Sequence, residues 1–337
     1  MKSYRLLDFG GFDDLKIAEE DVPTPGRGEV LIRVRAASLN FRDLAMATGQ
    51  YPLEHVAGLI PLSDGAGEIV AVGDEVTSFA VGDNVINGFH PRWFGGAAPA
   101  DAGSDQYGSS RNGWLTEYKV VSQEAVVPFP DYLTYEEAAT LPCAAVTAWT
   151  ALQNGRPVGP GQTVLTQGTG GVSLFAVQLA KLLGANVIAT TSNAEKAEVL
   201  RALGADHVVN YRETPTWGEH AKALTGGAGV QRVVEIGGAG TLSQSMRAIA
   251  ADGEIEIIGF LDSFEHADIN FFELFGSGAT LRVLAVGDRD ALKAMLAAVE
   301  SVRLKPVIDS VHQFDDAVAG YQRAASGAAV GKVVISI

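Results

Sequence analysis

The stretch TVLTQGTGGVSLFAVQLAK (residues 163–181) constrains this chain more than any other. Residues 163–165 suit a buried parallel strand, and residues 172–183 are apolar on nearly every face, which predicts a helix buried against a sheet. The glycines between them let the backbone turn sharply and approach a pyrophosphate, and the helix N-terminus would direct free N–H groups at an anion. Because Ser173 occupies the third position of the G-x-G-x-x-G pattern, the surrounding sequence must decide whether this motif binds a dinucleotide.

The residues after about 133 supply that context, because helical and strand patterns alternate there. Tyr135 to Leu152 has the pattern of a helix. Further strands are expected at residues 186–191, 207–210, 230–236, 254–260 and 279–286. Ser192 and Glu195 form an S-x-x-E capping box, which predicts that a helix begins after the first of these strands. Strands that alternate with helices imply an α/β fold with a parallel, doubly wound sheet.

The first 125 residues or so are rich in strand patterns instead. Residues 30–35 alternate Val, Ile and Val with Leu, Arg and Arg, as in a half-buried strand. Residues 64–83 place short β-branched runs between glycines, which is typical of a small barrel. Residues 331–337 are interpreted as a last strand that rejoins this first domain. The Gly-, Ala- and Asp-rich residues 88–113 form a long loop, either a surface excursion or a lid whose aromatic side chains cover a substrate.

Charge and cysteine content exclude several classes of protein. The formal net charge of −15 disfavours binding to nucleic acid or to an anionic membrane, because no basic excess exists to neutralise phosphates. Cys143 is the only cysteine, so neither an intrachain disulfide nor a cysteine-based zinc cluster can form. The N-terminus lacks the apolar core of a signal peptide, and no apolar run reaches the roughly 18 residues of a membrane span. We therefore expect a cytoplasmic protein.

Six motifs together resemble the medium-chain dehydrogenase/reductase (MDR) superfamily, and within it the zinc-independent, quinone-oxidoreductase-like and alcohol-dehydrogenase-like branch. These motifs are PGRGEVLIRVRAASLNFRD (25–43), DGAGEIVAVGDEVTSFAVGDNVI (64–86), LPCAAVTAW (141–149), QGTGGVSLFAVQLAK (167–181), LGADHVVNYR (203–212) and GKVVISI (331–337). The resemblance implies a GroES-like β-barrel domain built from residues 1–125 and 289–337. It implies a Rossmann domain over residues 126–288, with the cofactor in the cleft between the two domains.

The end of the second predicted Rossmann strand bears on the choice of cofactor. NAD-binding Rossmann folds usually place Asp or Glu there, where it binds the ribose 2′-OH, but residues 190–192 are Thr, Thr and Ser. Relatives that use NADPH employ a serine, a lysine and a tyrosine in this region, and the matching positions are Ser192, Lys196 and Tyr211. We therefore favour NADP(H). The alternative explanation makes Ser192 a helix cap, Lys196 a surface lysine and Tyr211 a packing residue.

The resemblance assigns further contacts to the cofactor. Thr147 matches a position that contacts the nicotinamide. Lys332 matches a basic residue that reaches the pyrophosphate, although an exposed lysine near the end of the chain is the alternative interpretation. The complete set of predicted cofactor-binding residues is Thr147, Gly168, Thr169, Gly170, Gly171, Val172, Ser192, Lys196, Tyr211, Gly237 and Lys332.

Zinc-dependent relatives bind their catalytic metal through a Cys, a His and a second Cys, with a Glu nearby. In this chain Asn40 stands at the first position, and Ser63-Asp64 replaces His-Glu, so only Cys143 retains a ligand type. One thiolate, a hydroxyl and an amide do not make the usual tetrahedral zinc site. We therefore expect no metal, and we interpret Cys143 as a buried, inert thiol in an apolar helix.

Without a metal, hydrogen-bond donors must polarise the substrate. Tyr51 matches a tyrosine that related enoyl-thioester reductases use as a proton donor. Asn40 and Asp43 match residues that line the same cleft, where Asn40 could orient the substrate or the nicotinamide ribose. Tyr51 as an aromatic turn residue, with water as the proton donor, is the alternative. Asp43 is interpreted as a structural carboxylate that accepts backbone N–H bonds.

Three further residues have polar side chains that could act on a substrate. His90 has the chemistry of an acid or base near neutral pH, but we interpret it as a solvent-exposed histidine. Arg42 and Arg92 are candidates for binding an acidic substrate, and ordinary salt bridges explain them equally well.

These inferences favour an NADPH-dependent, zinc-independent oxidoreductase that acts on a small-molecule quinone, carbonyl or activated alkene. An enoyl-thioester reductase is the alternative enzyme, and an NADPH-binding scaffold or stress protein with little turnover is the alternative of another class. The resemblance also implies a homodimer. Residues 279–286 could pair with their copy, because an exposed apolar strand edge needs to be covered.

Overall fold

The computed structural model describes residues 1–53, 56–261 and 269–337, and the chain forms two compact units. Unit 1 comprises Met1–Val146 and Gly287–Ile337, and unit 2 comprises Thr147–Val286. The boundary predicted at residue 125 lies earlier than this division, because helix α2 (Tyr135–Ala138) packs against the main sheet of unit 1.

Unit 2 contains a six-stranded sheet in the order β10-β9-β8-β11-β12-β13, and every pair of neighbours is parallel. Its strands are β8 (Thr163–Gln167), β9 (Asn186–Thr191), β10 (His207–Asn210), β11 (Val230–Glu235), β12 (Ile249–Ile257) and β13 (Thr280–Val283). Numbered within the sheet, this is the order 3-2-1-4-5-6 of a Rossmann domain. The predicted doubly wound α/β sheet is therefore confirmed.

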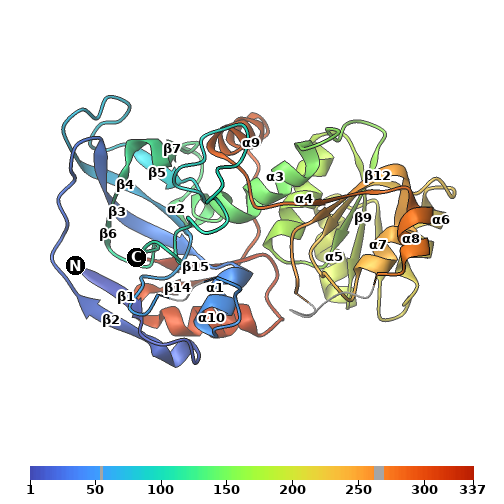
Figure 1. Ribbon diagram of the computed structural model, residues 1–337, viewed down its shortest axis with the longest axis horizontal. Coiled ribbons are helices and arrows are strands. Elements are labelled where there is room, and N and C mark those ends of the chain that lie inside the picture. The colour runs from blue at the N-terminus through green and yellow to red at the C-terminus, as the bar shows by residue number, and fades with distance from the viewer. Residues whose placement is uncertain (54–55, 262–268) are drawn as a thin grey trace. The chain divides into compact units, whose positions relative to one another are not determined.

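Helices cover both faces of this sheet, with α4 and α5 on one side and α6, α7 and α8 on the other (Figure 1). Their bounds are α3 (Val146–Gln153), α4 (Gly171–Leu182), α5 (Ala194–Ala202), α6 (Trp217–Leu224), α7 (Leu242–Ala248) and α8 (Phe271–Ser277). Leu165 and Ile188 of the sheet pack with Trp217 of α6 and Met246 of α7 in one core cluster. The glycine-rich turn thus joins a fully covered strand to a buried helix, as expected.

Two local predictions for this region are wrong. The helix α5 begins one residue later than the predicted capping box, because the side chain of Asn193, not Ser192, accepts a hydrogen bond from the backbone N–H of Lys196 at 2.8 Å. The single helix expected from Tyr135 to Leu152 is interrupted by a π-helical turn, η3 (Leu141–Ala145), which contains Pro142. Proline has no backbone N–H to continue the regular hydrogen-bond ladder.

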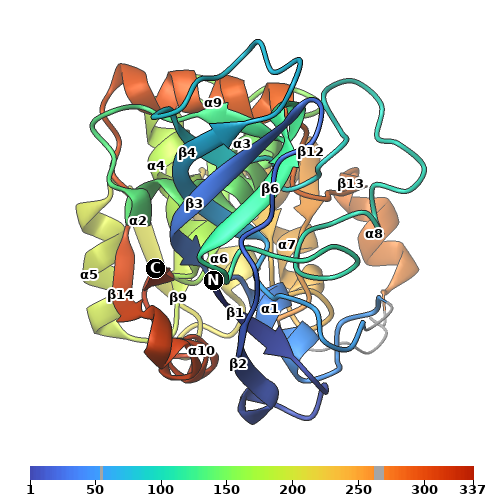
Figure 2. The ribbon, with the colours of Figure 1, turned by 90° about the vertical axis from the view of Figure 1, so that its left-hand side faces the viewer.

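Unit 1 is organised around a seven-stranded sheet in the order β14-β15-β3-β4-β5-β7, with β6 paired to β3. The strands are β3 (Glu29–Ser38), β4 (Asp64–Val72), β5 (Asn84–Asn87), β6 (Tyr118–Ser122), β7 (Val126–Pro128), β14 (Ile308–Gln313) and β15 (Lys332–Ser336), with a hairpin of β1 (Lys2–Leu6) and β2 (Leu15–Glu19). Figure 2 shows β3 between β4 and β6. As predicted, the last strand rejoins the first domain, since β15 pairs antiparallel with β3.

The interior of unit 1 follows the alternation in β3. Val30, Ile32 and Val34 are at most 1% exposed, whereas Arg33 points to solvent. The remaining helices of this unit are α1 (Phe41–Ala47), α9 (Arg289–Ser301), α10 (Ala317–Ala325) and the short turns η1 (Phe12–Asp14), η2 (Gln123–Ala125) and η4 (Phe314–Asp316). Together with the sheet they form the GroES-like domain of an α/β protein. Among the described residues, no helix has the length and apolarity that a membrane span requires.

Candidate functional site

The turn between β8 and α4 is built to leave backbone N–H groups accessible. Gly168 has a φ of 71°, a conformation that favours glycine, and its N–H donates to the carbonyl of Thr190 at 2.8 Å. Gly170 is the N-cap of α4 and has no side chain to cover the first turn of that helix. The N–H groups at the start of this twelve-residue helix are therefore available to an anion such as a pyrophosphate.

Ser173, which stands in place of the third glycine, is fully buried in α4. Its hydroxyl donates to the carbonyl of Gln167 at 2.6 Å. The serine therefore links the first turn of the helix to the end of β8. The residue that replaces the third glycine of the motif thus has a defined structural role.

A buried carboxylate that the sequence analysis missed joins the end of β8 to the end of β11. Glu235 is 1% exposed and accepts hydrogen bonds from Gln167 Nε2 at 2.7 Å and from the backbone N–H groups of Gly237 and Gly238 at 3.0 Å each. The hydroxyls of Thr241, the N-cap of α7, and of Ser245 in α7 also donate to it. This carboxylate therefore holds the turn that contains the predicted residue Gly237. A glutamate just before a Gly-Gly pair at the end of an apolar strand was the available signal.

The predicted 2′-phosphate residues lie at two neighbouring strand ends. Thr190 and Thr191 end β9 and are almost fully buried, and the N–H of Tyr211 donates to the carbonyl of Thr191 at 3.0 Å. Ser192 and Lys196 are half-buried, whereas Tyr211 is 41% exposed. Parallel pairing of β9 with β10 therefore brings these residues to one edge of the sheet, where hydroxyls stand in place of an acid.

The remaining predicted cofactor residues of unit 2 are mostly covered. Thr147 lies in α3 and is 3% exposed, and Thr169 is 5% exposed in the glycine-rich turn. Val172 lies in the first turn of α4 and is half-buried. Their assignment to the cofactor stays a prediction.

In unit 1 the N-terminus of α1 and the start of β4 form a polar cluster around Asn40, which is half-buried. Asn40 Nδ2 donates to Asp64 Oδ2 at 3.0 Å and lies 3.3 Å from Ser63 Oγ. The Ser63 hydroxyl donates to Asp64 Oδ1 at 2.7 Å, and the backbone N–H of Cys143 donates to Asp64 Oδ2 at 3.1 Å. The four residues at the positions of the family's zinc ligands and glutamate thus form one hydrogen-bonded group.

Lys332 belongs to this cluster. It is 3% exposed, and its ammonium donates to the carbonyl of Leu39 and to Asn40 Oδ1, both at 2.5 Å. Burial lowers the pKa of Lys332 and raises the pKa of Asp64, and the attraction between the two charges opposes both shifts. Its predicted contact with a pyrophosphate stays a prediction, but the alternative of an exposed lysine is wrong.

Asp43 is a structural carboxylate, as predicted. It forms a capping box with Asn40, whose backbone N–H donates to Asp43 Oδ2 at 2.9 Å. Burial is the main cause that raises the pKa of Asp43 to about 6, and the neighbouring guanidinium of Arg42 opposes this shift. Arg42 is itself buried and donates to the carbonyl of Tyr107 and to Gln106 Oε1, so it anchors the loop of residues 88–113.

The other candidates of unit 1 differ in how well they were predicted. Tyr51 is half-buried, with its ring 5.4 Å from the guanidinium carbon of Arg42. The expectation of an exposed His90 is wrong, because its ring is 4% exposed and packs edge-on against Phe89 and Trp93. Arg92 forms exposed ion pairs with two aspartates of its own loop, Asp101 and Asp105.

Cys143 departs in part from its prediction. It lies in the π-helical turn η3, and its side chain is half-buried. Burial raises the pKa of the thiol, and the nearby carboxylate of Asp64 raises it further. The thiol therefore stays protonated at neutral pH and is a poor nucleophile, in keeping with the predicted inert role.

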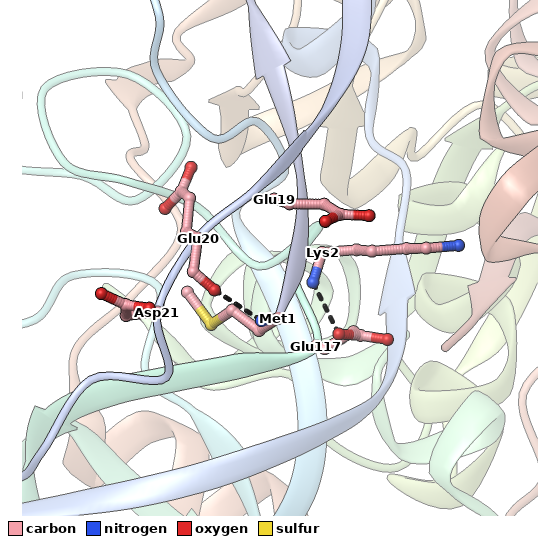
Figure 3. A pocket seen from close by; sticks show the side chains of 6 residues that line it. All are labelled: Met1, Lys2, Glu19, Glu20, Asp21 and Glu117. Atoms are coloured by element: carbon pink, nitrogen blue, oxygen red, sulfur yellow. Dashed lines mark hydrogen bonds between the residues drawn. The ribbon is translucent and has the colours of Figure 1, made fainter.

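A separate hollow of about 590 Å³ lies beside the hairpin of β1 and β2 in unit 1 (Figure 3). It is lined by Met1, Lys2, Glu19, Glu20, Asp21 and Glu117. The Met1 amino group donates to the Glu20 carbonyl at 2.5 Å, and the backbone N–H of Lys2 donates to Glu117 Oε2 at 2.6 Å. Its four carboxylates would repel an anionic dinucleotide, and it shares no residue with the predicted site.

Comparisons with known proteins agree with this architecture. Residues 26–131 match the family model described as the alcohol dehydrogenase GroES-like domain, and residues 171–301 match the model described as zinc-binding dehydrogenase. The chain is 42% identical to a zinc-type alcohol dehydrogenase-like protein of Schizosaccharomyces pombe, over 98% of this chain and 97% of that protein. It is 27% identical to the human quinone oxidoreductase, over 99% and 97% of the two chains.

Solved structures are similar over the whole length. A putative alcohol dehydrogenase from Sinorhizobium meliloti is 39% identical with a TM-score of 0.93, over 100% of this chain and 98% of that chain. An NAD-dependent alcohol dehydrogenase is 33% identical with a TM-score of 0.90, over 100% of both chains. A mycobacterial protein in complex with NADPH is 29% identical with a TM-score of 0.84, again over 100% of both chains.

Proposed function

Because the chain belongs to the medium-chain dehydrogenase/reductase superfamily and is an NAD(P)-dependent oxidoreductase, we propose that it uses NADPH, without zinc, to reduce a quinone, a carbonyl compound or an activated alkene. The observation that carries this proposal is the polar cluster around Asn40. An amide, a hydroxyl and a lysine ammonium occupy the region where the resemblance places a metal in zinc-dependent relatives. Polarisation of the substrate then falls to hydrogen-bond donors.

The residues at the carboxyl ends of β9 and β10 support the preference for NADPH. A carboxylate at the end of β9 would repel a 2′-phosphate, but Thr190, Thr191 and Ser192 carry hydroxyls. Lys196 lies in the first turn of α5 and Tyr211 directly follows β10, so a cation and a phenol flank the same edge. One similar structure is an NAD-dependent enzyme and another holds NADPH, so the residues of this chain must decide between the two cofactors.

The chemistry of the cluster supports a site without zinc. The Lys332 ammonium donates to Asn40 Oδ1, so a cation already occupies the amide oxygen that a metal would have to use. Of the three positions that match zinc ligands, Cys143 alone retains a usual ligand type, because Asn40 and Ser63 supply an amide and a hydroxyl. Among the described residues, no three His, Cys, Asp or Glu side chains gather as a metal site requires.

The roles of the chain's own residues follow from this proposal. The N–H groups at the start of α4 bind the pyrophosphate, and Gly168 and Gly170 keep the turn free of side chains. Asn40 orients the reacting group, and Tyr51 donates the proton that accompanies reduction. When NADPH is bound, its nicotinamide supplies the hydride.

Oxidation of NADPH by a substrate panel tests the proposal. The panel contains 1,2-naphthoquinone, a crotonyl thioester and simple aldehydes, and binding of NADPH and NADH is measured separately by fluorescence titration. We expect turnover of a quinone or an aldehyde, and a Kd for NADPH at least roughly tenfold lower than that for NADH, because the 2′-phosphate gains charge-assisted hydrogen bonds.

The other outcomes separate the alternatives. Turnover of the crotonyl thioester alone would identify an enoyl-thioester reductase. Binding of NADPH without turnover of any substrate would favour a cofactor-binding scaffold. Equal affinity for NADH would contradict the assignment of Ser192, Lys196 and Tyr211, and stoichiometric zinc in a metal assay of the purified protein would contradict the metal-free mechanism.

A further inference from the structure

The cluster around Asn40 contains a continuous hydrogen-bonded path between two buried charges. The Lys332 ammonium, at the start of β15, donates to Asn40 Oδ1 at 2.5 Å. Asn40 Nδ2 in turn donates to Asp64 Oδ2 at 3.0 Å. Lys332 is 3% exposed and Asp64 is fully buried, whereas Asn40 between them is half-buried. Asn40 is therefore the member of this path that reaches the surface of unit 1.

We propose that Lys332 is a positioning residue, which fixes the orientation of the Asn40 amide and supplies the fixed positive charge of the site. This inference rests on the proposed function, in which Asn40 orients the reacting group. It differs from the role in pyrophosphate binding that the resemblance implies for Lys332, and the two roles predict different effects on cofactor affinity.

Lys332 and Asp64, at the two ends of the path, require the same orientation of the Asn40 amide. An ammonium only donates, so it requires the carbonyl oxygen of Asn40, and a carboxylate only accepts, so it requires the amide nitrogen. Turning the amide by 180° would place Oδ1 against the Asp64 carboxylate and Nδ2 against the Lys332 ammonium. Both hydrogen bonds would then be replaced by repulsive contacts, so the two charges select one of the two amide orientations.

The charge of Lys332 is also needed by the buried carboxylate. Asp64 accepts hydrogen bonds from the Ser63 hydroxyl, the Asn40 amide and the Cys143 backbone N–H, which are all neutral donors. The Lys332 ammonium attracts this carboxylate, and removal of one of two interacting buried charges is strongly destabilising. Among the residues that the structure describes, the other charges acting on this hydrogen-bonded group are those of Arg42 and Asp43, which largely cancel, since the guanidinium of Arg42 lies 3.4 Å from Asp43 Oδ1. Lys332 is therefore the charge that balances Asp64.

The backbone carbonyl of Leu39 completes the placement of the ammonium. It accepts from Lys332 Nζ at 2.5 Å, while the backbone N–H of Leu39 donates to the carbonyl of Val333 at 3.0 Å. Pairing of β15 with β3 thus holds the lysine beside the residue that precedes Asn40. The placement of Lys332 beside Asn40 depends on this strand pairing, whereas the local sequence contributes the capping box between Asn40 and Asp43.

The test compares Lys332→Met, Asp64→Asn and the double variant with the wild-type protein. Three quantities are measured: the Kd for NADPH, the kcat with saturating NADPH, and the melting temperature. The side-chain amide signals of Asn40 are followed by NMR, and they are identified by their absence from the spectrum of Asn40→Asp. Lys119→Met is the control, because Lys119 is also buried in unit 1 but lies outside the cluster and donates to the carbonyl of Asn112.

We expect Lys332→Met to lower kcat by ~10–100-fold, which is the loss typical of residues that orient metal ligands through a hydrogen bond, and to leave the Kd for NADPH within about twofold. The Asn40 amide signals should shift or broaden. The double variant should melt at a higher temperature than Lys332→Met, because Asp64→Asn removes the unpaired carboxylate, but its kcat should stay low. Lys119→Met should lower the melting temperature without lowering kcat.

A Kd for NADPH raised more than tenfold with kcat unchanged would overturn the inference and identify Lys332 as a pyrophosphate ligand. Unchanged Asn40 amide signals, full recovery of kcat in the double variant, or an equal loss of kcat in Lys119→Met would overturn it as well. If the wild-type protein turns over no substrate, the proposed function fails. The NMR and melting experiments then still decide whether Lys332 positions Asn40.

Discussion

At the scale of single residues, four charged side chains of unit 1 are buried close to Asn40. Asp43, Asp64, Arg42 and Lys332 are at most 6% exposed, and each has an opposite charge or several hydrogen-bond partners nearby. Charged groups are seldom buried this deeply unless they are paired. The concentration of such groups around Asn40 therefore marks the region where the chain departs from an ordinary apolar core.

The buried carboxyl of Asp43 predicts a specific dependence of stability on pH. Its pKa in the folded protein, about 6, lies above the ordinary value of 3.8, so folding favours the protonated form. Its contribution to the free energy of unfolding is fully present below about pH 4, falls as the pH rises to 6, and stays low above that. The shift corresponds to about 3 kcal/mol. Asp43→Asn should abolish this fall, as measured by urea unfolding between pH 4 and pH 7. Parallel profiles for the two proteins would contradict the assignment.

Tyr51 offers a second prediction at this scale. If its phenol donates the proton, Tyr51→Phe should lower kcat by roughly 100-fold or more, because general acid catalysis contributes that much. The Kd for NADPH should not change, since the substitution removes one hydroxyl and keeps the ring that packs near Arg42. The measurement is steady-state turnover of the best substrate of the panel. An unchanged kcat would assign proton delivery to water.

At the scale of elements, hydrogen bonds at the ends of the parallel strands hold the predicted cofactor residues in place. Gln167 at the end of β8 accepts from the backbone N–H groups of Ile236 and Gly237, both at 3.1 Å, while its amide donates to Glu235. Gly237 cannot be replaced without strain, since an added Cβ would lie 2.3 Å from Thr241 Oγ1. Hydrogen bonds thus join the turn after β8 to the turn after β11, although 68 residues separate Gln167 from Glu235 in sequence.

A substitution of Glu235 tests whether its carboxylate holds these two turns together. Glu235→Gln exchanges one acceptor oxygen for an NH₂ group, which then faces donors such as the N–H groups of Gly237 and Gly238. We expect a loss of about 1–3 kcal/mol in the free energy of unfolding and weaker NADPH binding. Glu198→Gln is the matched control, because Glu198 forms an exposed salt bridge in the same unit and its loss should cost less than about 1 kcal/mol. Equal effects of the two variants would show that Glu235 has no special role.

At the scale of the whole molecule, unit 2 presents an apolar surface at one edge of its sheet. The strand β13 pairs with β12 and ends the sheet order, and its Val283 is 81% exposed. Phe271, Phe272 and Phe275 of the preceding helix α8 are each at least 70% exposed. Exposed strand edges with apolar side chains are usually covered by another chain. These observations support the proposed homodimer.

Size-exclusion chromatography with light scattering checks this proposal. We expect the wild-type protein to elute as a dimer, and we expect Val283→Lys combined with Phe272→Asp to elute as a monomer, because buried charges oppose association. Val81→Lys is the control, since Val81 is 61% exposed in unit 1, away from β13 in sequence. A monomeric wild-type protein, or a dimeric double variant, would contradict the proposal.

The local pattern of the sequence was sufficient to predict much of the fold. The glycine-rich turn, the alternation of strands with helices and the apolar periodicity of β3 depend on neighbouring residues, so they can be recognised before any tertiary contact is known. The absence of an acid at the end of β9 is likewise a fact of the sequence. The position of the α5 cap was missed by one residue, because Ser192 and Asn193 are both suitable cap residues.

The tertiary structure alone decided how the polar residues combine. Lys332 and Asn40 are 292 residues apart, and their contact exists because β15 pairs with β3. Glu235 meets Gln167 because β8 and β11 are neighbours in the sheet, and His90 is buried because Phe89 and Trp93 pack around it. The sequence by itself determined the type of each element and the dinucleotide turn, since these follow from local periodicity. Only folding determined which charges are buried together, because burial and pairing depend on contacts between distant parts of the chain.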